Sequence, residues 1–185
     1  MKPCIVVVDM LKDFFKRPPL SLNKKRLIRN INDLTKLARK NNVPIIWVKQ
    51  EFKPDLSDAF LSMKKRDFKS TIKGTEGAEI LDELNRRKDE QVIVKKRYSA
   101  FFNTKLDQIL KNLGVDTLII VGINTHACVR MTAIDAYQRD YEVMIAKNCV
   151  FSWDWIHHMI TLFYLKHAMC IKVWSNKKIN NLFTK

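Results

Sequence analysis

Short runs of almost wholly apolar residues alternate along the chain with longer stretches in which apolar residues recur every three or four positions. Six such runs predict strands, at residues 4–8, 44–49, 91–95, 117–123, 141–146 and 169–174. Five stretches with helical spacing predict helices, at residues 23–41, 76–87, 104–112, 127–139 and 153–167. Strands and helices therefore alternate, which is the order typical of a parallel sheet with helices packed on it.

The composition of the strands indicates how the layers are arranged. Residues 5–8 and 118–121 consist only of Ile, Val and Leu, so both faces of these strands are expected to be buried. Helices must then cover both faces of the sheet, and we predict an α/β fold, a three-layer α/β/α sandwich. Residues 50–75 are polar and basic, which favours a loop or short helix over the sheet edge. The length of 185 residues, 46% of them apolar, fits a single domain over residues 1–185.

Charge and glycine content narrow the class of protein. Lys and Arg number 34 against 19 Asp and Glu, a formal net charge of +15, so a non-catalytic basic binding protein is one alternative. The basic clusters at 24–26, 64–66 and 86–88 are scattered, and no nucleic-acid motif accompanies them, so we predict no nucleic-acid partner. The four glycines fit neither the G-x-G-x-x-G fingerprint nor the phosphate loop of nucleotide-binding proteins.

The chain carries no signal for export or for a membrane. No apolar run approaches the roughly 18 residues of a membrane span, and the N-terminus lacks the features of a signal peptide. We therefore expect no membrane association and a cytoplasmic location. The four widely spaced cysteines, with no C-x-x-C pair among them, then predict reduced thiols rather than a disulfide framework or a zinc site.

Three chemically active side chains follow predicted strands. Asp9 comes after the first strand, Lys95 ends the third, and Cys128 begins a helix after the fourth. Because the carboxyl ends of parallel strands lie at one edge of the sheet, a carboxylate, an ammonium and a thiol should share that edge. A helix N-terminus and a nearby cation can lower the pKa of a thiol below about 7.5. Cys128 could then act as a nucleophile, Asp9 as proton acceptor, and Lys95 as the cation that holds both.

Each of these residues has a purely structural alternative. A single Asp after a strand is often a turn former, and buried cysteines are mostly inert packing. Cys149, after the fifth strand, is a rival thiol, and His126 is a rival base two residues before Cys128. The backbone N–H groups of Asn124 and Cys128 are the candidates for an oxyanion hole.

Three segments together resemble the signature segments of the isochorismatase-like cysteine hydrolases. They are residues 6–14 (VVVDMLKDF), 95–101 (KKRYSAF) and 121–133 (VGINTHACVRMTA). The resemblance implies a catalytic triad of Asp9, Lys95 and Cys128, a parallel sheet of order 3-2-1-4-5-6, and a cis peptide bond between Ile123 and Asn124. It also implies a homo-oligomer, a dimer or tetramer.

The implied strand order raises one geometric question. The third strand lies two strands from the first, roughly 10 Å at about 4.8 Å for each step. The long side chain of Lys95 must therefore lean inward to reach Asp9. If it did not, Lys96 would be the next candidate.

The resemblance also guides the choice of substrate. Isochorismate hydrolases of this family commonly carry glycine where this chain has Cys128, so the retained thiol favours cleavage of a C–N bond over a vinyl ether. Nicotinamidases of the family hold a metal through histidines between the second and third strands, whereas residues 50–90 contain none, and we predict no metal and no cofactor. Phe14 is a candidate wall for a small flat substrate, and Arg97 and Arg130 are either carboxylate clamps or structural ion-pair partners.

The sequence thus predicts a cysteine hydrolase that opens a small amide, ureide or carbamoyl compound through a thioester on Cys128. An isochorismatase-type vinyl-ether hydrolase and a non-catalytic basic binding protein remain the alternatives.

Overall fold

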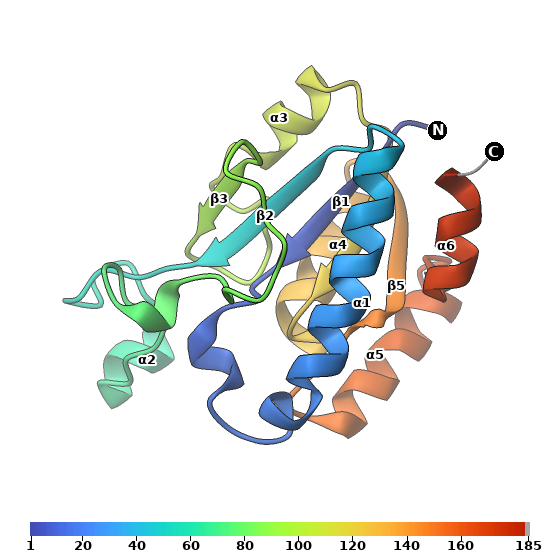
Figure 1. Cartoon of the computed structure of the whole chain (residues 1–185). Coiled ribbons are helices and arrows are strands. Elements are labelled where there is room, and N and C mark those ends of the chain that lie inside the picture. The colour runs from blue at the N-terminus through green and yellow to red at the C-terminus, as the bar shows by residue number, and fades with distance from the viewer. Residues whose placement is uncertain (184–185) are drawn as a thin grey trace.

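The computed structural model describes residues 1–183 and places a six-stranded sheet at the centre of the molecule (Figure 1). The strands are β1 (Pro3–Val8), β2 (Ile45–Gln50), β3 (Val92–Lys95), β4 (Thr117–Gly122), β5 (Glu142–Val150) and β6 (Lys172–Trp174). They are ordered β3-β2-β1-β4-β5-β6, and every neighbouring pair is parallel. The predicted α/β class and the strand order that the resemblance implied are both confirmed.

Helices cover the two faces of this sheet. They are α1 (Leu20–Lys40), α2 (Leu61–Arg66), α3 (Leu106–Asn112), α4 (Arg130–Tyr137), α5 (Trp155–His167) and α6 (Asn176–Phe183). Two apolar clusters show the division: side chains of α1 and α6 pack on one face, and side chains of α3, α4 and α5 pack on the other. Alternate residues of β1 enter opposite clusters, since Ile5 and Val7 face α1 while Val6 and Val8 face α4. This two-sided burial is why the strands are almost wholly apolar.

The segment between β2 and β3 contains a short helix, one of the two structures that its composition predicted. Helix α2 lies here, away from the two main layers (Figure 1). Phe52, Leu56, Ala59 and Met63 form a small separate apolar cluster that anchors the segment.

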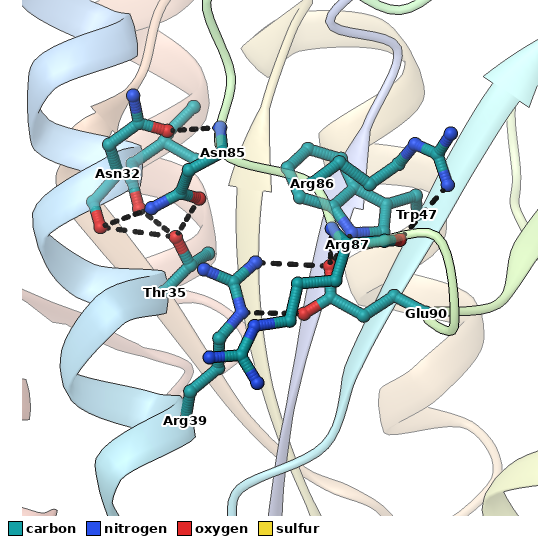
Figure 2. Close-up of polar contacts among 9 residues, drawn as sticks. Asn32, Thr35, Arg39, Trp47, Asn85, Arg86, Arg87 and Glu90 are labelled. Carbon is teal, nitrogen blue, oxygen red and sulfur yellow. Dashed lines mark hydrogen bonds and ion pairs between the residues drawn. The ribbon is translucent and has the colours of Figure 1, made fainter.

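The helix predicted over residues 76–87 is wrong. The structure has only one 3₁₀ turn there, Glu76–Ala78, followed by irregular chain that lies against α1 and β2 (Figure 2). The Asn85 backbone N–H donates to Asn32 Oδ1 at 2.9 Å, and the Thr35 hydroxyl donates to Asn85 Oδ1 at 2.9 Å. These bonds to a distant helix satisfy polar groups that an isolated helix would satisfy internally, so tertiary contacts override the local periodicity.

Glu90 connects the end of the same segment to α1 and β2 (Figure 2). Its carboxylate accepts hydrogen bonds from Arg39 Nε at 2.7 Å, from the Trp47 indole N–H at 2.8 Å and from the Arg87 backbone N–H at 2.9 Å. Burial tends to raise the pKa of Glu90, but the Arg39 guanidinium and the other donors outweigh it and hold the pKa below its usual value. The ionised carboxylate therefore joins α1, β2 and the loop that leads into β3.

Glu90→Ala should lower the free energy of unfolding by about 3 kcal/mol, because Arg39 and the Trp47 indole lose their partner in a partly buried place. Urea unfolding followed by circular dichroism measures this change. Asp89→Ala, at the exposed neighbouring position, is the matched control and should change stability by less than about 0.5 kcal/mol. Equal effects of the two substitutions would contradict the role given to Glu90.

Two other differences from the sequence prediction lie in the second half of the chain. β5 continues four residues beyond the predicted end at Ala146 and ends at Val150, and α6 was not predicted at all. α6 is short, and its apolar residues Ile179 and Phe183 are buried against the α1 face. Within residues 1–183, no helix combines the length and apolar character needed to cross a membrane. The single domain over residues 1–185 stays a prediction, and residues 184–185 lie outside the described part.

Candidate active site

The three side chains singled out at the strand ends meet at one edge of the sheet. Lys95 Nζ lies 2.7 Å from Asp9 Oδ2 and donates a hydrogen bond to Cys128 Sγ at 3.4 Å. It also donates to the Arg97 backbone carbonyl at 3.0 Å. The carboxylate, the sulfur and the backbone carbonyl together fix the position of the nitrogen.

Gln50 lies between Asp9 and Lys95, on strand β2. It ends β2 and is the register partner of Lys95 on β3. Its backbone N–H donates to the other Asp9 oxygen, Oδ1, at 2.8 Å, so the strand between β1 and β3 also holds the carboxylate. Lys96, the fallback candidate, contacts the Glu51 carbonyl and lies 3.1 Å from Asp58 instead.

The backbone around Asp9 has an unusual conformation. Asp9 has φ = +52°, in the left-handed region that few side chains adopt but Asp tolerates. The adjacent strand β4 ends at Gly122, where a Cβ atom would lie 2.0 Å from the Val8 carbonyl oxygen. Only glycine allows β4 to approach β1 this closely. A strained residue held by its surroundings at a polar cluster is typical of functional sites.

Cys128 lies in a single π-helical turn, Thr125–Val129, which leads from β4 into α4. The Asn124 carbonyl accepts hydrogen bonds from the backbone N–H groups of Ala127 and Val129, both at 3.1 Å, and thereby closes the turn. The peptide bond between Ile123 and Asn124 is cis, as the resemblance implied. The role of the Asn124 and Cys128 N–H groups as an oxyanion hole stays a prediction.

The three side chains are almost sealed from solvent: Asp9 and Lys95 are 0% exposed and Cys128 is 5% exposed. The expected low pKa of the thiol is wrong, because burial raises the pKa of Cys128 to about 12, and the Lys95 charge only partly opposes this effect. Burial also disfavours the charged form of Lys95, but the neighbouring Asp9 opposes this effect, and the pKa of the ammonium is raised. The resting site therefore holds the Lys95 ammonium in an ion pair with Asp9, beside a neutral thiol.

The rival residues lie elsewhere. Cys149 belongs to the apolar cluster on the opposite face of the sheet, and its thiol donates to Asn176 Oδ1 at 3.3 Å. His126 Nδ1 is paired with the Ser152 hydroxyl at 2.7 Å rather than with the sulfur of Cys128.

Two of the three candidate substrate-binding side chains, Arg97 and Arg130, already contact other residues of the protein. Phe14 is half-buried against the α1 face, and its contact with a substrate stays a prediction. The Arg97 guanidinium donates to the backbone carbonyls of Asp58 and Lys96. The Arg130 guanidinium lies 4.9 Å from the centre of the Tyr164 ring. Arg97 thus binds two backbone carbonyls, and Arg130 makes a cation–π contact with Tyr164.

Sequence reasoning missed Gln50 as a member of the site. Its backbone N–H bonds to Asp9, and its buried side-chain nitrogen, Nε2, has no hydrogen-bond partner among residues 1–183. The rule that selected the other residues, a polar side chain at the carboxyl end of a parallel strand, would have found it if β2 had been predicted to end at Gln50 rather than Lys49.

His158, on helix α5, contacts the turn that carries Cys128. Its Nδ1 lies 2.9 Å from the Thr125 hydroxyl, and the side chain is buried. Burial lowers the pKa of His158 from 6.5 to about 4, and the charges of Arg26 and His126 add to this effect. The imidazole is therefore neutral at pH 7.

The depressed pKa of His158 predicts a pH-dependent stability. Between pH 6.5 and 4 the unfolded chain binds the proton and the folded chain does not, so the free energy of unfolding should fall by about 2 kcal/mol over this range. His158→Gln keeps a polar partner for Thr125 and should remove this part of the slope. Urea unfolding at several pH values measures both proteins, and identical slopes would contradict the prediction.

Asp9, Lys95 and Cys128 do not line a surface hollow of about 660 Å³, which is formed by residues including Lys12, Lys49 and Arg86. Among residues 1–183, no group of three or more His, Cys, Asp and Glu side chains is arranged to hold a metal ion. Because Asp9, Lys95 and Cys128 are almost sealed from solvent, a substrate of this site must be small, or the site must open to admit it.

Comparison with known proteins identifies the family. The sequence pattern of the Isochorismatase domain matches residues 3–176. The chain is 36% identical over 145 residues to a probable inactive nicotinamidase of Arabidopsis thaliana, with 74% of each chain covered. Its structure resembles an isochorismatase family protein from Desulfovibrio vulgaris (TM-score 0.90, 27% identity, 100% and 99% of the two chains covered). It also resembles N-carbamoylsarcosine amidase from Thermoplasma acidophilum (TM-score 0.82, 26% identity, 95% and 97% covered). The chain belongs to the isochorismatase family of hydrolases.

Proposed function

We propose that this protein hydrolyses a C–N bond in a small amide, ureide or carbamoyl compound, with Cys128 as the nucleophile. The observation that carries the proposal is the position of Lys95 Nζ, which contacts the Asp9 carboxylate and the Cys128 sulfur at once. The likeness to N-carbamoylsarcosine amidase supports a C–N bond as the target. The likeness to a probable inactive nicotinamidase makes a test of activity essential.

The arrangement supports a mechanism in which the thiol loses its proton during the attack. Sγ of Cys128 bonds to the substrate carbonyl carbon while its proton passes to Asp9, so a free thiolate need not accumulate despite the raised pKa. In this proposal the N–H groups of Asn124 and Cys128 stabilise the oxyanion. Breakdown of the tetrahedral intermediate breaks the C–N bond, and the leaving nitrogen takes the proton from Asp9. Water then cleaves the thioester, releases the acid and restores the thiol.

Lys95 has an electrostatic and positioning role in this proposal. Its charge balances Asp9 in the resting site, and it stays close to the sulfur while charge moves between the two groups. Because its ion pair with Asp9 and its hydrogen bonds to Cys128 and the Arg97 carbonyl already hold it in place, the ammonium needs little reorganisation during the reaction.

A screen for release of ammonia or amine across small amides, ureides and carbamoyl compounds tests the function. We expect turnover in one of these classes, and acid quenching should trap an acyl group on the peptide that contains Cys128, detectable by mass spectrometry. An acyl group on Cys149 would exchange the roles of the two cysteines. Absence of release in all three classes, together with cleavage of a vinyl ether, would replace the proposal by the isochorismatase-type reaction.

A further inference from the structure

A hollow of about 430 Å³ near the starts of β2 and β3 is lined almost wholly by cationic side chains. We call it the basic hollow, and its lining residues are Lys36, Arg39, Lys40, Asn85 and Arg87. The first three belong to the last two turns of α1, which leads into β2, and the other two belong to the loop that leads into β3. Asp9 and Lys95 lie at the opposite ends of the strands, so the basic hollow is separate from the site of Cys128.

Three of the four cations in the basic hollow have no carboxylate partner. Its lining contains no Asp or Glu, and Lys36, Lys40 and Arg87 form no ion pair with any side chain of residues 1–183. Only Arg39 is paired, with Glu90 at 2.7 Å. A concave surface lined by one sign of charge concentrates ions of the opposite sign. The basic hollow is therefore suited to an anion.

A second hollow of the same protein shows a different arrangement of charges. The hollow of about 660 Å³ contains Lys12, Lys49 and Arg86, but also Glu79 and Asp82. Lys12 lies 2.6 Å from Asp82, and Lys49 lies 3.3 Å from Glu79. Carboxylates thus pair with the lysines there. The overall positive charge of the chain does not by itself explain why the basic hollow has none in its lining.

Two lining residues of the basic hollow are held in place by the rest of the protein (Figure 2). Arg39 donates to Glu90 through Nε at 2.7 Å and through Nη2 at 3.0 Å, and its side chain is 10% exposed. These bonds leave three of the five N–H donors of the guanidinium for a ligand. Asn85 is fixed by its hydrogen bonds with Asn32 and Thr35. A ligand therefore need not order these two side chains, which favours binding.

The loop before β3, rather than a helix, brings Arg87 to the basic hollow. The Arg87 backbone N–H donates to Glu90 Oε2 at 2.9 Å, so the carboxylate that holds Arg39 also positions Arg87. Figure 2 shows the Arg87 side chain extending toward the Arg39 guanidinium. Cations at the end of a helix stabilise its dipole, but this reason does not apply to a loop residue. Two guanidinium groups at one hollow repel each other unless an anion binds them both.

The residue types in the lining indicate the chemistry of the ligand. The planar guanidinium of arginine matches the oxygens of a phosphoryl group in two parallel hydrogen bonds. Four cations match the charge of about −3 on a diphosphate group better than the single charge of a carboxylate. The lining contains no aromatic side chain on which a nucleobase could stack. A volume of about 430 Å³ is typical of a site for a small molecule.

We propose that the basic hollow binds a small ligand with two or more phosphoryl groups, which bridges Arg39 and Arg87. Lys36 and Lys40 supply further positive charge, and the Asn85 amide supplies a polar contact. The proposal does not depend on the reaction at Cys128, because the two sites lie at opposite ends of the strands.

Isothermal titration calorimetry of the full chain with inorganic diphosphate, at 0.15 M salt and without divalent cations, tests the proposal. One diphosphate should bind each chain with a dissociation constant below about 100 µM. Arg87→Gln should raise this constant at least 10-fold, since it removes one guanidinium from the site. The Arg87 side chain donates no hydrogen bond within residues 1–183, so this variant should keep its fold, which circular dichroism verifies.

Arg66→Gln is the matched control. Arg66 is exposed at the end of α2, forms no ion pair within residues 1–183, and its replacement lowers the net charge by the same amount. Its dissociation constant for diphosphate should stay within twofold of the wild-type value. Equal weakening by the two substitutions would show attraction by overall charge alone and overturn the proposal. Wild-type binding weaker than 1 mM would also overturn it.

Other anions test the assignment of the ligand. Inorganic phosphate should bind at least 10-fold more weakly than diphosphate, because it cannot bridge both guanidinium groups. Citrate that binds more tightly than diphosphate would contradict the phosphoryl assignment. A single-stranded oligonucleotide that binds more tightly, with affinity lost in Arg87→Gln, would assign the basic hollow to nucleic acid instead. Bound diphosphate should also raise the melting temperature of the wild type and leave that of Arg87→Gln almost unchanged.

Discussion

Cys128→Ala should abolish turnover of any substrate found in the screen, with a fall in kcat of at least about 10³-fold. The reason is that the proposed reaction proceeds through a bond to this sulfur, and among residues 1–183 no other cysteine is bonded to Lys95. Steady-state kinetics of the purified variant measures the effect. Since the substitution removes only a small buried thiol, the variant should keep its fold.

Cys149→Ala is the control matched in chemistry and burial. This thiol is also buried and also has a pKa raised to about 12 by burial, but it packs on the opposite face of the sheet beside Asn176. Its loss should leave kcat within about twofold. Activity retained in Cys128→Ala, with activity lost in Cys149→Ala, would contradict the site described here.

Lys95→Met should reduce the free energy of unfolding by about 3–5 kcal/mol, because the Asp9 carboxylate would remain buried without a cation. Asp9→Asn/Lys95→Met removes both charges and should recover most of this loss. Asn also tolerates the positive φ of position 9. Urea unfolding of the wild type, both single variants and the double variant measures the coupling between the two residues. In the proposed mechanism, all three variants are inactive.

Lys96→Met provides the comparison for the buried pair. Lys96 lies 3.1 Å from Asp58, and its side chain is 37% exposed, so this ion pair should contribute at most about 1 kcal/mol. If Lys95→Met were no more destabilising than Lys96→Met, the charged resting state described for Asp9 and Lys95 would be wrong.

The segment after Glu76 shows why periodicity alone could mislead. Its apolar spacing is compatible with a helix, but Asn85 and Glu90 bond to side chains of α1 and β2 that are distant in sequence. Nothing within residues 76–87 reveals these partners. The α1 prediction succeeded because that helix is long and its apolar side is repeated over many turns.

The sequence was enough to select the three side chains that meet at the sheet edge, whereas their catalytic roles stay predictions. Asp9, Lys95 and Cys128 could be selected because each stands at the carboxyl end of a predicted parallel strand or at the helix start that follows one, and the three resembled segments contain them. Gln50 was missed because its strand was predicted one residue too short. The distance from Lys95 to Asp9 could not be predicted, since it depends on the conformation that the Lys95 side chain adopts among the residues packed around it.

The alternation of buried strands and amphipathic helices, which depends on local periodicity, was enough to determine the parallel α/β architecture and the edge on which polar strand ends gather. Only the tertiary structure decided the protonation state of that edge, because desolvation depends on every group packed around an atom. The sequence places a cation and a helix start near Cys128, but the closed packing around its sulfur keeps the thiol neutral. The tertiary structure also decided which apolar residues of α5 are buried, because this depends on which parts of the chain pack against the helix.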